Sequence, residues 1–373
     1  MKLELLADHD VNVGRQPFLD CAKAFAAFWM VMVHVFEEYE LFEEGTFFAA
    51  DAPVFGKLLG SVFAGTFAAP VFMFAMGVGV AYSRNSAEAP MARRGLGLLL
   101  KWWLLDFVRY PLPKWILLWL APALANEYSE LRTLLAFLFE NDVLCFAGLA
   151  FLLLAVLKRL HVPAGGVLAL AVLMSALGSV VCRLDLGNFA ANLAVGPFVD
   201  VESEDVCSRF PLLNWFVFPA AGLLFGKMLR RCVSTARLFA VLTPLALAAF
   251  VPLTVWYWET DSGIMAPGEM SFYRMGLSDA LYVLTGVLVV LGSWEFAARF
   301  VRGWLKTAVA EVSKAITEVY IVQWMLVLWS EILVLEIMDF RIGAVGAVCL
   351  AVIIWLAACW IGCSWRRRFG NRA

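Results

Sequence analysis

The sequence predicts an all-α integral membrane protein with about ten transmembrane helices in one bundle, and three observations indicate this class. First, 62% of the 373 residues are hydrophobic and only 16% are charged, whereas soluble domains average about 45–50% apolar and about 25% charged residues. Second, continuous apolar runs of about 20 residues, the length that spans a bilayer, recur along the chain. Third, the loops between these runs alternate between basic and acidic character. Disorder needs the opposite composition, and a β-barrel needs alternating rather than continuous runs.

Each predicted span is a largely apolar run that ends at charged or turn-forming residues. A shorter run at 113–125 is flanked by proline, so we expect a re-entrant or interfacial segment there. We treat residues 1–373 as a single polytopic domain. The ten predicted spans are 18–36, 61–83, 94–110, 142–160, 164–182, 211–229, 236–257, 279–300, 316–337 and 342–363.

Basic residues indicate which side of the membrane each loop faces. With the N-terminus in the cytoplasm, the inner segments hold 19 Lys and Arg residues and the outer segments hold 8, while Lys23 and Lys101 lie within spans. Cytoplasmic loops carry such an excess in multi-pass proteins, so both termini are predicted to be cytoplasmic and the protein to lie in the cell membrane. Span 18–36 has no small-residue cleavage site after it, and we expect it to be retained.

The cysteines and the overall charge limit the kinds of site. Cys182 and Cys207 bracket the outer loop between two spans, where an oxidising exterior permits a disulfide worth about 3 kcal/mol. Two unrelated apolar cysteines are an equal alternative. None of the 8 cysteines forms a Cys-x-x-Cys pair, so no metal or redox site is predicted. Nucleic acid is not an expected partner, because 29 Lys and Arg residues face 31 Asp and Glu residues.

One span carries a group of ionisable residues. His34 lies in the outer half of span 18–36, whereas the other histidines, His9 and His161, fall in cytoplasmic segments. Ionisable groups inside a membrane are costly and are therefore candidates for function, although a histidine bonded to a neighbouring helix is the structural alternative. At about 100° per residue, Asp20, Lys23 and His34 share one narrow stripe of this helix. The stripe predicts a polar line that faces the bundle interior.

Glu38 lies on the same stripe, one turn beyond His34. A carboxylate at this distance can hold an imidazole in one tautomer and stabilise the imidazolium as it takes a proton. The pair is therefore a candidate general base. The alternative is that Glu38 is one of several glutamates in an acidic outer loop.

The stretch from Arg15 to Lys23, followed by His34, resembles the first-helix signature of transmembrane acyltransferases, namely the acyltransferase-3 family and bacterial relatives of heparan-α-glucosaminide N-acetyltransferase. Lys23 replaces the usual Arg of this signature and lacks its bidentate fork. Gln323 stands where many members have His. Other segments resemble the family in the same order along the chain: Ala69–Gly77 with Ser83, Arg93–Gly95, Asn141–Gly148, Phe210–Trp215 with Gly222 and Gly226, and Ser313–Trp324.

The resemblance implies transfer of an acyl group, usually acetyl, from cytoplasmic acyl-CoA to a sugar, a cell-envelope glycan or a related acceptor, without a metal. It implies that His34, with Glu38, is the general base, or that the imidazole carries the acyl group itself. The implied donor-binding residues are Lys23, Asp20, Arg93 and Arg94, although the positive-inside rule alone also explains the two arginines. Candidates for the oxyanion donor or the acceptor site are Asn214, Tyr320, Gln323, Asp142 and Arg109, of which the last two are equally explained as paired structural charges.

A proton-coupled small-molecule transporter is the competing class, because intramembrane Asp, Lys and His residues also suit a carrier. The lack of two inverted halves in the sequence argues against it. Expected partners are the bilayer, acyl-CoA and the acceptor, and a homodimer is compatible with the sequence.

Overall fold

The structure is a computed structural model, and it describes residues 5–39, 41, 68–83, 87–120, 131–260 and 270–370. Within these residues the regular elements are helices, and β pairing is limited to isolated bridges. The chain divides into two compact units, which are described one at a time. Unit 1 comprises Met1–Ala75, Lys227–Phe272 and Leu281–Ala373, and unit 2 comprises Met76–Gly226 and Tyr273–Ala280. The treatment of 1–373 as a single domain stays a prediction.

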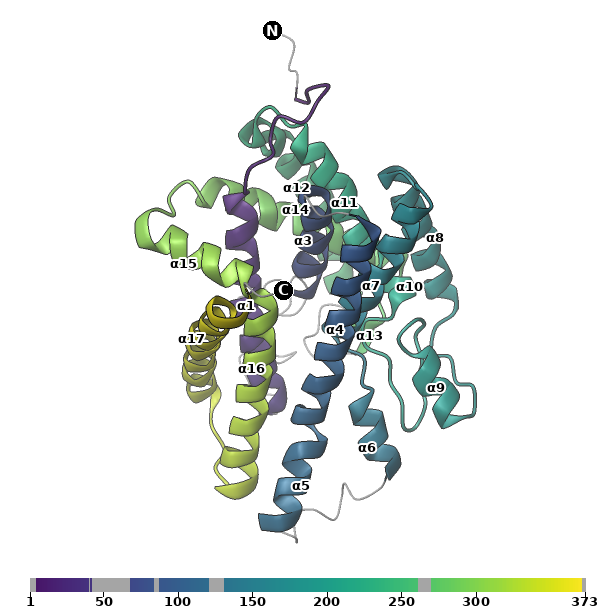
Figure 1. Cartoon of the computed structure of the whole chain (residues 1–373), viewed down its shortest axis with the longest axis vertical. Coiled ribbons are helices and arrows are strands. Elements are labelled where there is room, and N and C mark those ends of the chain that lie inside the picture. The colour runs from purple at the N-terminus through teal and green to yellow at the C-terminus, as the bar shows by residue number, and fades with distance from the viewer. Residues whose placement is uncertain are drawn as a thin grey trace. The chain divides into compact units, whose positions relative to one another are not determined.

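Unit 1 is built around α1 (Figure 1). This helix begins at Pro17, where the fixed backbone of proline suits the first turn and its missing N–H is not needed. The helices of unit 1 are α1 (Pro17–Glu38), the first part of α3 (Ala68–Tyr82), α12 (Thr235–Glu259), most of α14 (Leu277–Ala297), α15 (Gly303–Lys314), α16 (Ile316–Glu331), the π-helical turn η5 (Ile332–Ile337) and α17 (Ala344–Phe369).

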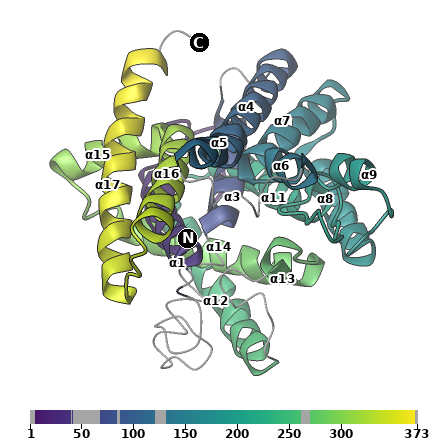
Figure 2. The same cartoon turned by 90° about the horizontal axis from the view of Figure 1, so that it is seen from below.

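The C-terminal half of α1 forms an apolar core with α16 and α17. Val31, Val35 and Phe36 of α1 meet Val327 of α16 and Ala351 of α17, and each of these side chains is at most 1% exposed. In Figure 2, α17 is seen along its length beside α1 and α16. The three helices therefore position the polar residues of α1 relative to α16.

Small residues let α16 and α17 approach closely. A Cβ atom at Gly362 of α17 would lie 2.9 Å from the backbone nitrogen of Val319 in α16. Ala358 of α17 and Ala315 before α16 are fully buried at the same contact. Small residues of this kind associate helices inside a bilayer, where apolar burial provides little driving force.

Unit 2 is built around the pair α4 and α7. A Cβ atom at Gly95 of α4 would lie 2.8 Å from the backbone oxygen of Gly148 in α7, so this close approach requires glycine at position 95. The unit contains α4 (Glu88–Arg109), α5 (Pro111–Leu120), α6 (Leu131–Leu138), α7 (Val143–Arg159), α8 (Ala164–Val180), α9 (Phe189–Val195), α10 (Leu212–Trp215) and most of α11 (Val217–Arg230), while α13 (Met270–Tyr273) lies at the boundary of the units.

The described part of every predicted span is helical over most of its length. Residues 61–67 of the second span lie outside the described residues. Among the described residues, six helices are long and apolar enough to cross a membrane, which supports an all-helical, multi-pass membrane protein, while the count of ten spans stays a prediction. These six helices are Pro17–Glu38, Leu212–Arg230, Thr235–Glu259, Leu277–Ala297, Ile316–Leu335 and Ala344–Phe369.

Two segments between the spans have structure that the sequence left open. The predicted re-entrant segment 113–125 contains the end of α5, which begins at Pro111, and residues 121–125 lie outside the described residues. The segment between the predicted spans 279–300 and 316–337 contains α15, which we did not predict. This helix has 12 residues, which are too few to span a bilayer, so a criterion based on long apolar runs does not identify it.

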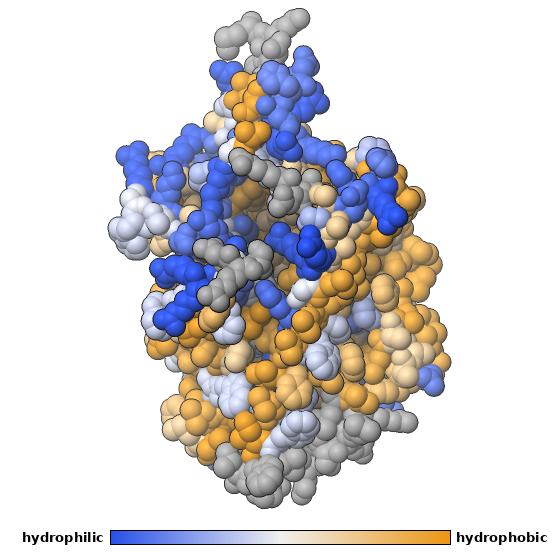
Figure 3. Space-filling model, in the orientation of Figure 1, coloured by the Kyte–Doolittle hydropathy of each residue, from blue (hydrophilic) through white to orange (hydrophobic). Residues whose placement is uncertain are grey.

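Hydropathy varies along each unit (Figure 3). On the face shown, hydrophilic residues gather around the start of α1 and over α15, while the surface over α16 is largely hydrophobic. In unit 2, hydrophobic residues cover most of the surface over α4 and α7. Extensive apolar surface of this kind is expected where helices contact lipid.

Candidate active site

His34 of α1 meets two residues of α16. The imidazole is half-buried and stacks on the Trp324 indole, with ring centroids 3.9 Å apart and planes 27° from parallel. Its Nδ1 lies 3.1 Å from Nε2 and 3.4 Å from Oε1 of Gln323. Gln323 is completely buried and Trp324 is 4% exposed. A polar ring is thus held between a buried amide and an aromatic plane.

The amide of Gln323 determines which imidazole nitrogen can accept a proton. If Oε1 accepts a hydrogen bond from Nδ1–H, the lone pair of Nε2 is available to a substrate, which is the tautomer that a general base needs. If the amide nitrogen donates to Nδ1 instead, the proton lies on Nε2. A half-turn of the amide exchanges the two arrangements. We predicted Gln323 as an oxyanion or acceptor residue, and the structure adds this direct contact with His34.

Trp324 is a site residue that our sequence reasoning did not assign. It lies within the segment Ser313–Trp324 that carries the family resemblance, directly after Gln323. An indole face within about 6 Å of a cation attracts it, so the stacking favours the imidazolium that forms when His34 takes a proton.

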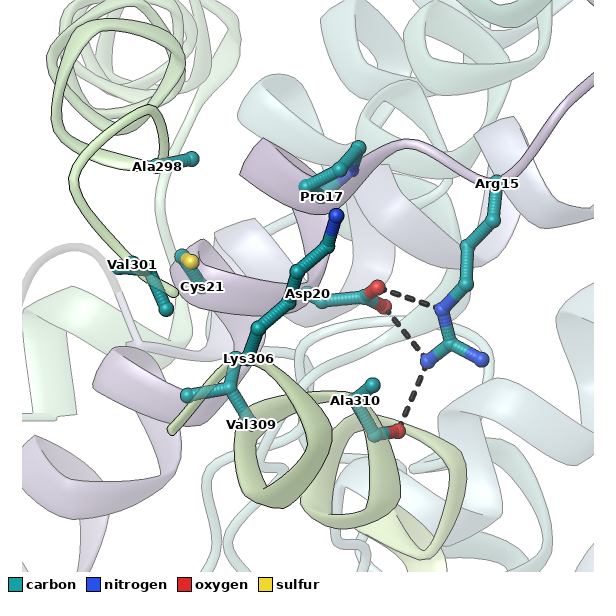
Figure 4. Close-up of a pocket in the computed structure, with 9 residues that line it drawn as sticks. All are labelled: Arg15, Pro17, Asp20, Cys21, Ala298, Val301, Lys306, Val309 and Ala310. Atoms are coloured by element: carbon teal, nitrogen blue, oxygen red, sulfur yellow. Dashed lines mark hydrogen bonds and ion pairs between the residues drawn. The ribbon is translucent and has the colours of Figure 1, made fainter. Parts of the chain in front are cut away.

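Asp20 forms a second polar cluster near the start of α1. Its carboxylate accepts from Arg15 Nε at 2.6 Å and from Arg15 Nη2 at 3.0 Å, and Oδ1 also accepts from Ser313 Oγ at 2.6 Å (Figure 4 shows the contacts of Arg15). Arg15 Nη2 donates in turn to the carbonyl of Ala310 at 2.8 Å. Lys23 Nζ donates to the carbonyl of Ser313 at 3.4 Å. The bidentate partner of Asp20 is therefore Arg15.

The Asp20 cluster joins α1 to α15, and the His34 contact joins α1 to α16. Asp20 and His34 are 14 residues apart on α1, which is about 21 Å along a helix axis. Ser313 is at the end of α15, 10 residues before Gln323 in the chain. Because α15 leads into α16 through Ala315 alone, the Asp20 cluster anchors the start of α16 beside α1. Arg15 and Ser313 are thus positioning residues that we did not assign from the sequence.

Glu38 and Tyr320 belong to unit 1, and their predicted roles stay predictions. Glu38 is the last residue of α1, one turn beyond His34, and is partly buried. Tyr320 is 7% exposed on α16, one turn before Gln323. Both helices that carry the His34 contact therefore also hold a predicted site residue within one turn of it.

Arg93 and Arg94 lie on the first turns of α4 in unit 2, and both are exposed. The Arg94 guanidinium lies over the Phe151 ring of α7, 4.8 Å from its centroid. A cation over an aromatic face is stabilised by about 0.5–1 kcal/mol at an exposed site, so Phe151 orients the Arg94 side chain. The predicted role of the two arginines in donor binding stays a prediction.

Arg109 and Asp142 are buried together in unit 2. Arg109 Nη1 lies 3.3 Å from Asp106 Oδ1 and 3.8 Å from Asp142 Oδ2. Asp142 Oδ1 also accepts from the backbone nitrogens of Leu144 at 2.7 Å and Cys145 at 3.0 Å, so Asp142 caps the start of α7. The geometry is that of paired structural charges, which was one of the two alternatives. A role for Arg109 and Asp142 in acceptor binding stays a prediction.

Asn214 is also buried in unit 2, between α8 and the turn before α14. Its Nδ2 donates to the carbonyl of Met275 at 3.1 Å and lies 3.5 Å from that of Arg274. The amide thus ties α10 to the turn before α14, and the predicted oxyanion or acceptor role of Asn214 stays a prediction.

Cys182 and Cys207 are both exposed and free, so the disulfide between them is not formed in this structure. Cys207 Sγ instead accepts from Arg274 Nη2 at 2.9 Å. Nearby, Arg274 lies 3.2 Å from the buried carboxylate of Asp200. Burial raises the pKa of Asp200 above its usual range, although Arg274 and the backbone nitrogen of Arg183 oppose this effect.

The long apolar helices are those of a multi-pass membrane protein. Its candidate polar site lies between α1 and α16, where His34 contacts the buried amide of Gln323. The sequence profile of the acyltransferase-3 family, which describes an acyltransferase domain, matches residues 16–362. The chain therefore belongs to the acyltransferase-3 family, as the resemblance predicted. No curated protein and no solved structure matches the chain. Membership supports acyl transfer as the activity.

Proposed function

We propose that the protein transfers an acyl group, usually acetyl, from acyl-CoA to a hydroxyl or amine of a sugar, a cell-envelope glycan or a related acceptor, with His34 as general base. The observation that carries this proposal is the contact between His34 Nδ1 and the buried Gln323 amide. It supplies what a catalytic imidazole needs, which is a fixed ring orientation and a partner for the nitrogen that does not react.

Proton transfer at His34 accompanies the transfer of the acyl group. Nε2 takes the proton of the acceptor hydroxyl or amine while the acceptor oxygen or nitrogen attacks the thioester carbonyl carbon. The new C–O or C–N bond forms and the C–S bond breaks. The imidazolium, stacked on Trp324, then returns the proton to the thiolate and releases free CoA. A covalent acyl-imidazole is the alternative route, and it predicts ping-pong kinetics.

The acyl-CoA donor is proposed to bind from the cytoplasm. The phosphates of CoA require cationic partners, and the exposed Arg93 and Arg94 are suited to them because guanidinium groups make paired, charge-assisted bonds to phosphate. Lys23 and Asp20 lie at the inner end of the stripe that leads along α1 to His34. We propose that they border the path of the pantetheine arm.

The cytoplasmic donor depends on the proposed topology of ten spans with both termini inside a cell membrane. Its basis is the alternation of basic and acidic loops, which places 85–92 inside and 186–208 outside. A cysteine introduced in 87–92 should resist a membrane-impermeant maleimide added from outside, while the exposed Cys182 and Cys207 react. Labelling of the introduced cysteine from outside would reverse the orientation.

The test of the catalytic role uses purified full-length protein and a thioester assay. Wild type should release free CoA from acetyl-CoA when candidate acceptors are added. His34→Ala and His34→Gln should both lose about 10²–10⁴ in turnover, because neither residue can accept the proton. Acyl-CoA affinity and the melting temperature of both variants should stay near wild type.

The proton-coupled transporter remains the alternative outcome of this assay. A carrier would accumulate a solute in liposomes and release no CoA. Near-normal thioester turnover in His34→Gln, together with a lowered melting temperature, would instead identify His34 as a structural residue.

A further inference from the structure

The end of α14, the turn that follows it and the start of α15 expose three aromatic side chains at intervals of four residues. Phe296, Phe300 and Trp304 are 62%, 69% and 80% exposed. In a membrane protein, aromatic residues near the ends of spanning helices lie at the level of the lipid headgroups. These three side chains therefore indicate contact with the membrane interface.

Basic residues alternate with the aromatic ones in the same segment. Arg299 pairs with Glu295 at 2.6 Å and lies over the Phe296 ring, 5.8 Å from its centroid. Arg302 and Lys306 are exposed, and the ion pairs made among the described residues involve neither of them. Two cationic side chains are thus available to an anion beside an exposed aromatic row.

The orientation of α15 suits an interfacial position. In Figures 1 and 2, α15 runs across the direction of α1. Gly303 has a φ of 58°, a left-handed conformation that glycine adopts without strain, and it allows the chain to turn sharply between α14 and α15. Helices with basic and apolar residues that lie across the spanning helices are typical of the plane of the membrane surface.

A pocket of about 160 Å³ opens between the start of α1 and this segment (Figure 4). Pro17 and Val301 contribute to its apolar walls, and the Lys306 side chain extends along it. Arg15 and Asp20 also line the pocket, where they are bonded to each other. The pocket therefore combines apolar walls with one cation that no described acidic residue neutralises.

We propose that residues 296–306 and this pocket form a binding site for an anionic phospholipid of the leaflet that faces the start of α1. Arg302 and Lys306 hold the lipid phosphate, and Phe300 and Trp304 lie beside its glycerol and upper acyl region. An anionic phospholipid fits both parts of the site. Its phosphate matches the cationic side chains, and its acyl chains match the aromatic and apolar surface beside them. The proposal goes beyond acyl transfer and does not depend on it.

Native mass spectrometry of the full-length protein in a neutral detergent tests the site, with phosphatidylglycerol and phosphatidylcholine as the probes. Wild type should retain phosphatidylglycerol in preference to phosphatidylcholine. Arg302→Gln with Lys306→Gln should weaken that preference by about 30-fold, which corresponds to about 1 kcal/mol for each basic side chain near a lipid surface. Trp304→Ala should weaken retention of both lipids.

The matched control is Lys158→Gln with Arg159→Gln, an exposed basic pair at the end of α7. This control should keep the preference for phosphatidylglycerol, and the melting temperatures of all variants should agree. An unchanged preference in the Arg302 and Lys306 variant, or an equal loss in the control, would overturn the proposal. A third result would assign the site to CoA. In that case free CoA would displace the lipid, and the Arg302 and Lys306 variant would lose affinity for CoA while it kept its preference for phosphatidylglycerol.

Discussion

The amide of Gln323 lies against Nδ1 of His34, and the two residues are 289 positions apart in the chain. The two residues meet where α1 and α16 pack. We therefore propose that Gln323 orients the imidazole, a role that the family resemblance alone did not give it.

We expect Gln323→Leu to lower turnover by about tenfold, because it removes one buried hydrogen bond of about 0.5–1.5 kcal/mol to His34. Gln323→Glu should move the acidic limb of the pH–rate profile to higher pH, because a neighbouring carboxylate favours the imidazolium and a general base must be neutral. Ser330→Ala is the control, since Ser330 accepts a hydrogen bond from Tyr39 at 3.2 Å at another contact of the same helices. A pH profile that stays unchanged in Gln323→Glu would contradict the orienting role.

Replacing both Arg93 and Arg94 by Ala should raise the KM for acyl-CoA more than it lowers kcat. Loss of charged phosphate contacts costs about 1.5–3 kcal/mol, which is about 10- to 150-fold in affinity. Steady-state kinetics with varied acyl-CoA measure this change. Lys158→Gln with Arg159→Gln again provides an exposed basic pair as control. If KM did not change, the phosphates would bind elsewhere.

The close contact of α4 and α7 can be tested with two glycines of one helix. Gly95→Ala would place a Cβ atom 2.8 Å from a backbone oxygen of α7, whereas a Cβ atom at Gly97 would meet nothing within 4 Å. Overpacking costs about 1–3 kcal/mol, so Gly95→Ala should lower the melting temperature. Gly97→Ala should leave it unchanged or raise it, because alanine favours helix. Equal melting temperatures for the two variants would show that α4 can move away from α7 without a loss of stability.

Glu140, between α6 and α7, should make unit 2 sensitive to acid. Burial alone would raise the pKa of this carboxyl group, but the guanidinium groups of Arg209, 3.1 Å away, and Arg109 hold it below its ordinary value of 4.5. A lowered pKa in the folded state means that the stabilisation is complete above pH 4.5 and is lost as the pH falls through the folded-state pKa.

Wild type should therefore be more stable than Glu140→Gln at neutral pH, by about 1.5–3 kcal/mol for a charged hydrogen bond. The difference should shrink as the pH falls below 4.5. Thermal unfolding of both proteins across this range measures it. A difference that stays constant with pH would mean that Glu140 stabilises the fold in its neutral form.

The sequence by itself determined the class of membrane protein, the approximate positions of the helices and the family. Apolar runs of spanning length follow from the thickness of the bilayer, and they do not depend on which helix packs on which. The 3.6-residue period likewise places Asp20, Lys23 and His34 on one face of α1, whatever helix lies beside that face. We did not predict α15, because a helix of 12 residues in a basic loop is too short to give an apolar run of spanning length.

Only the tertiary structure decided the partners of these residues. It paired Asp20 with Arg15 and Ser313, His34 with Gln323 and Trp324, and Arg109 with Asp106 and Asp142. Helical periodicity specifies which residues share a face of one helix, but it carries no information about the helix that covers that face. That choice depends on the packing of side chains from distant segments, such as the small residues at which α16 and α17 meet, and it exists only in the folded chain.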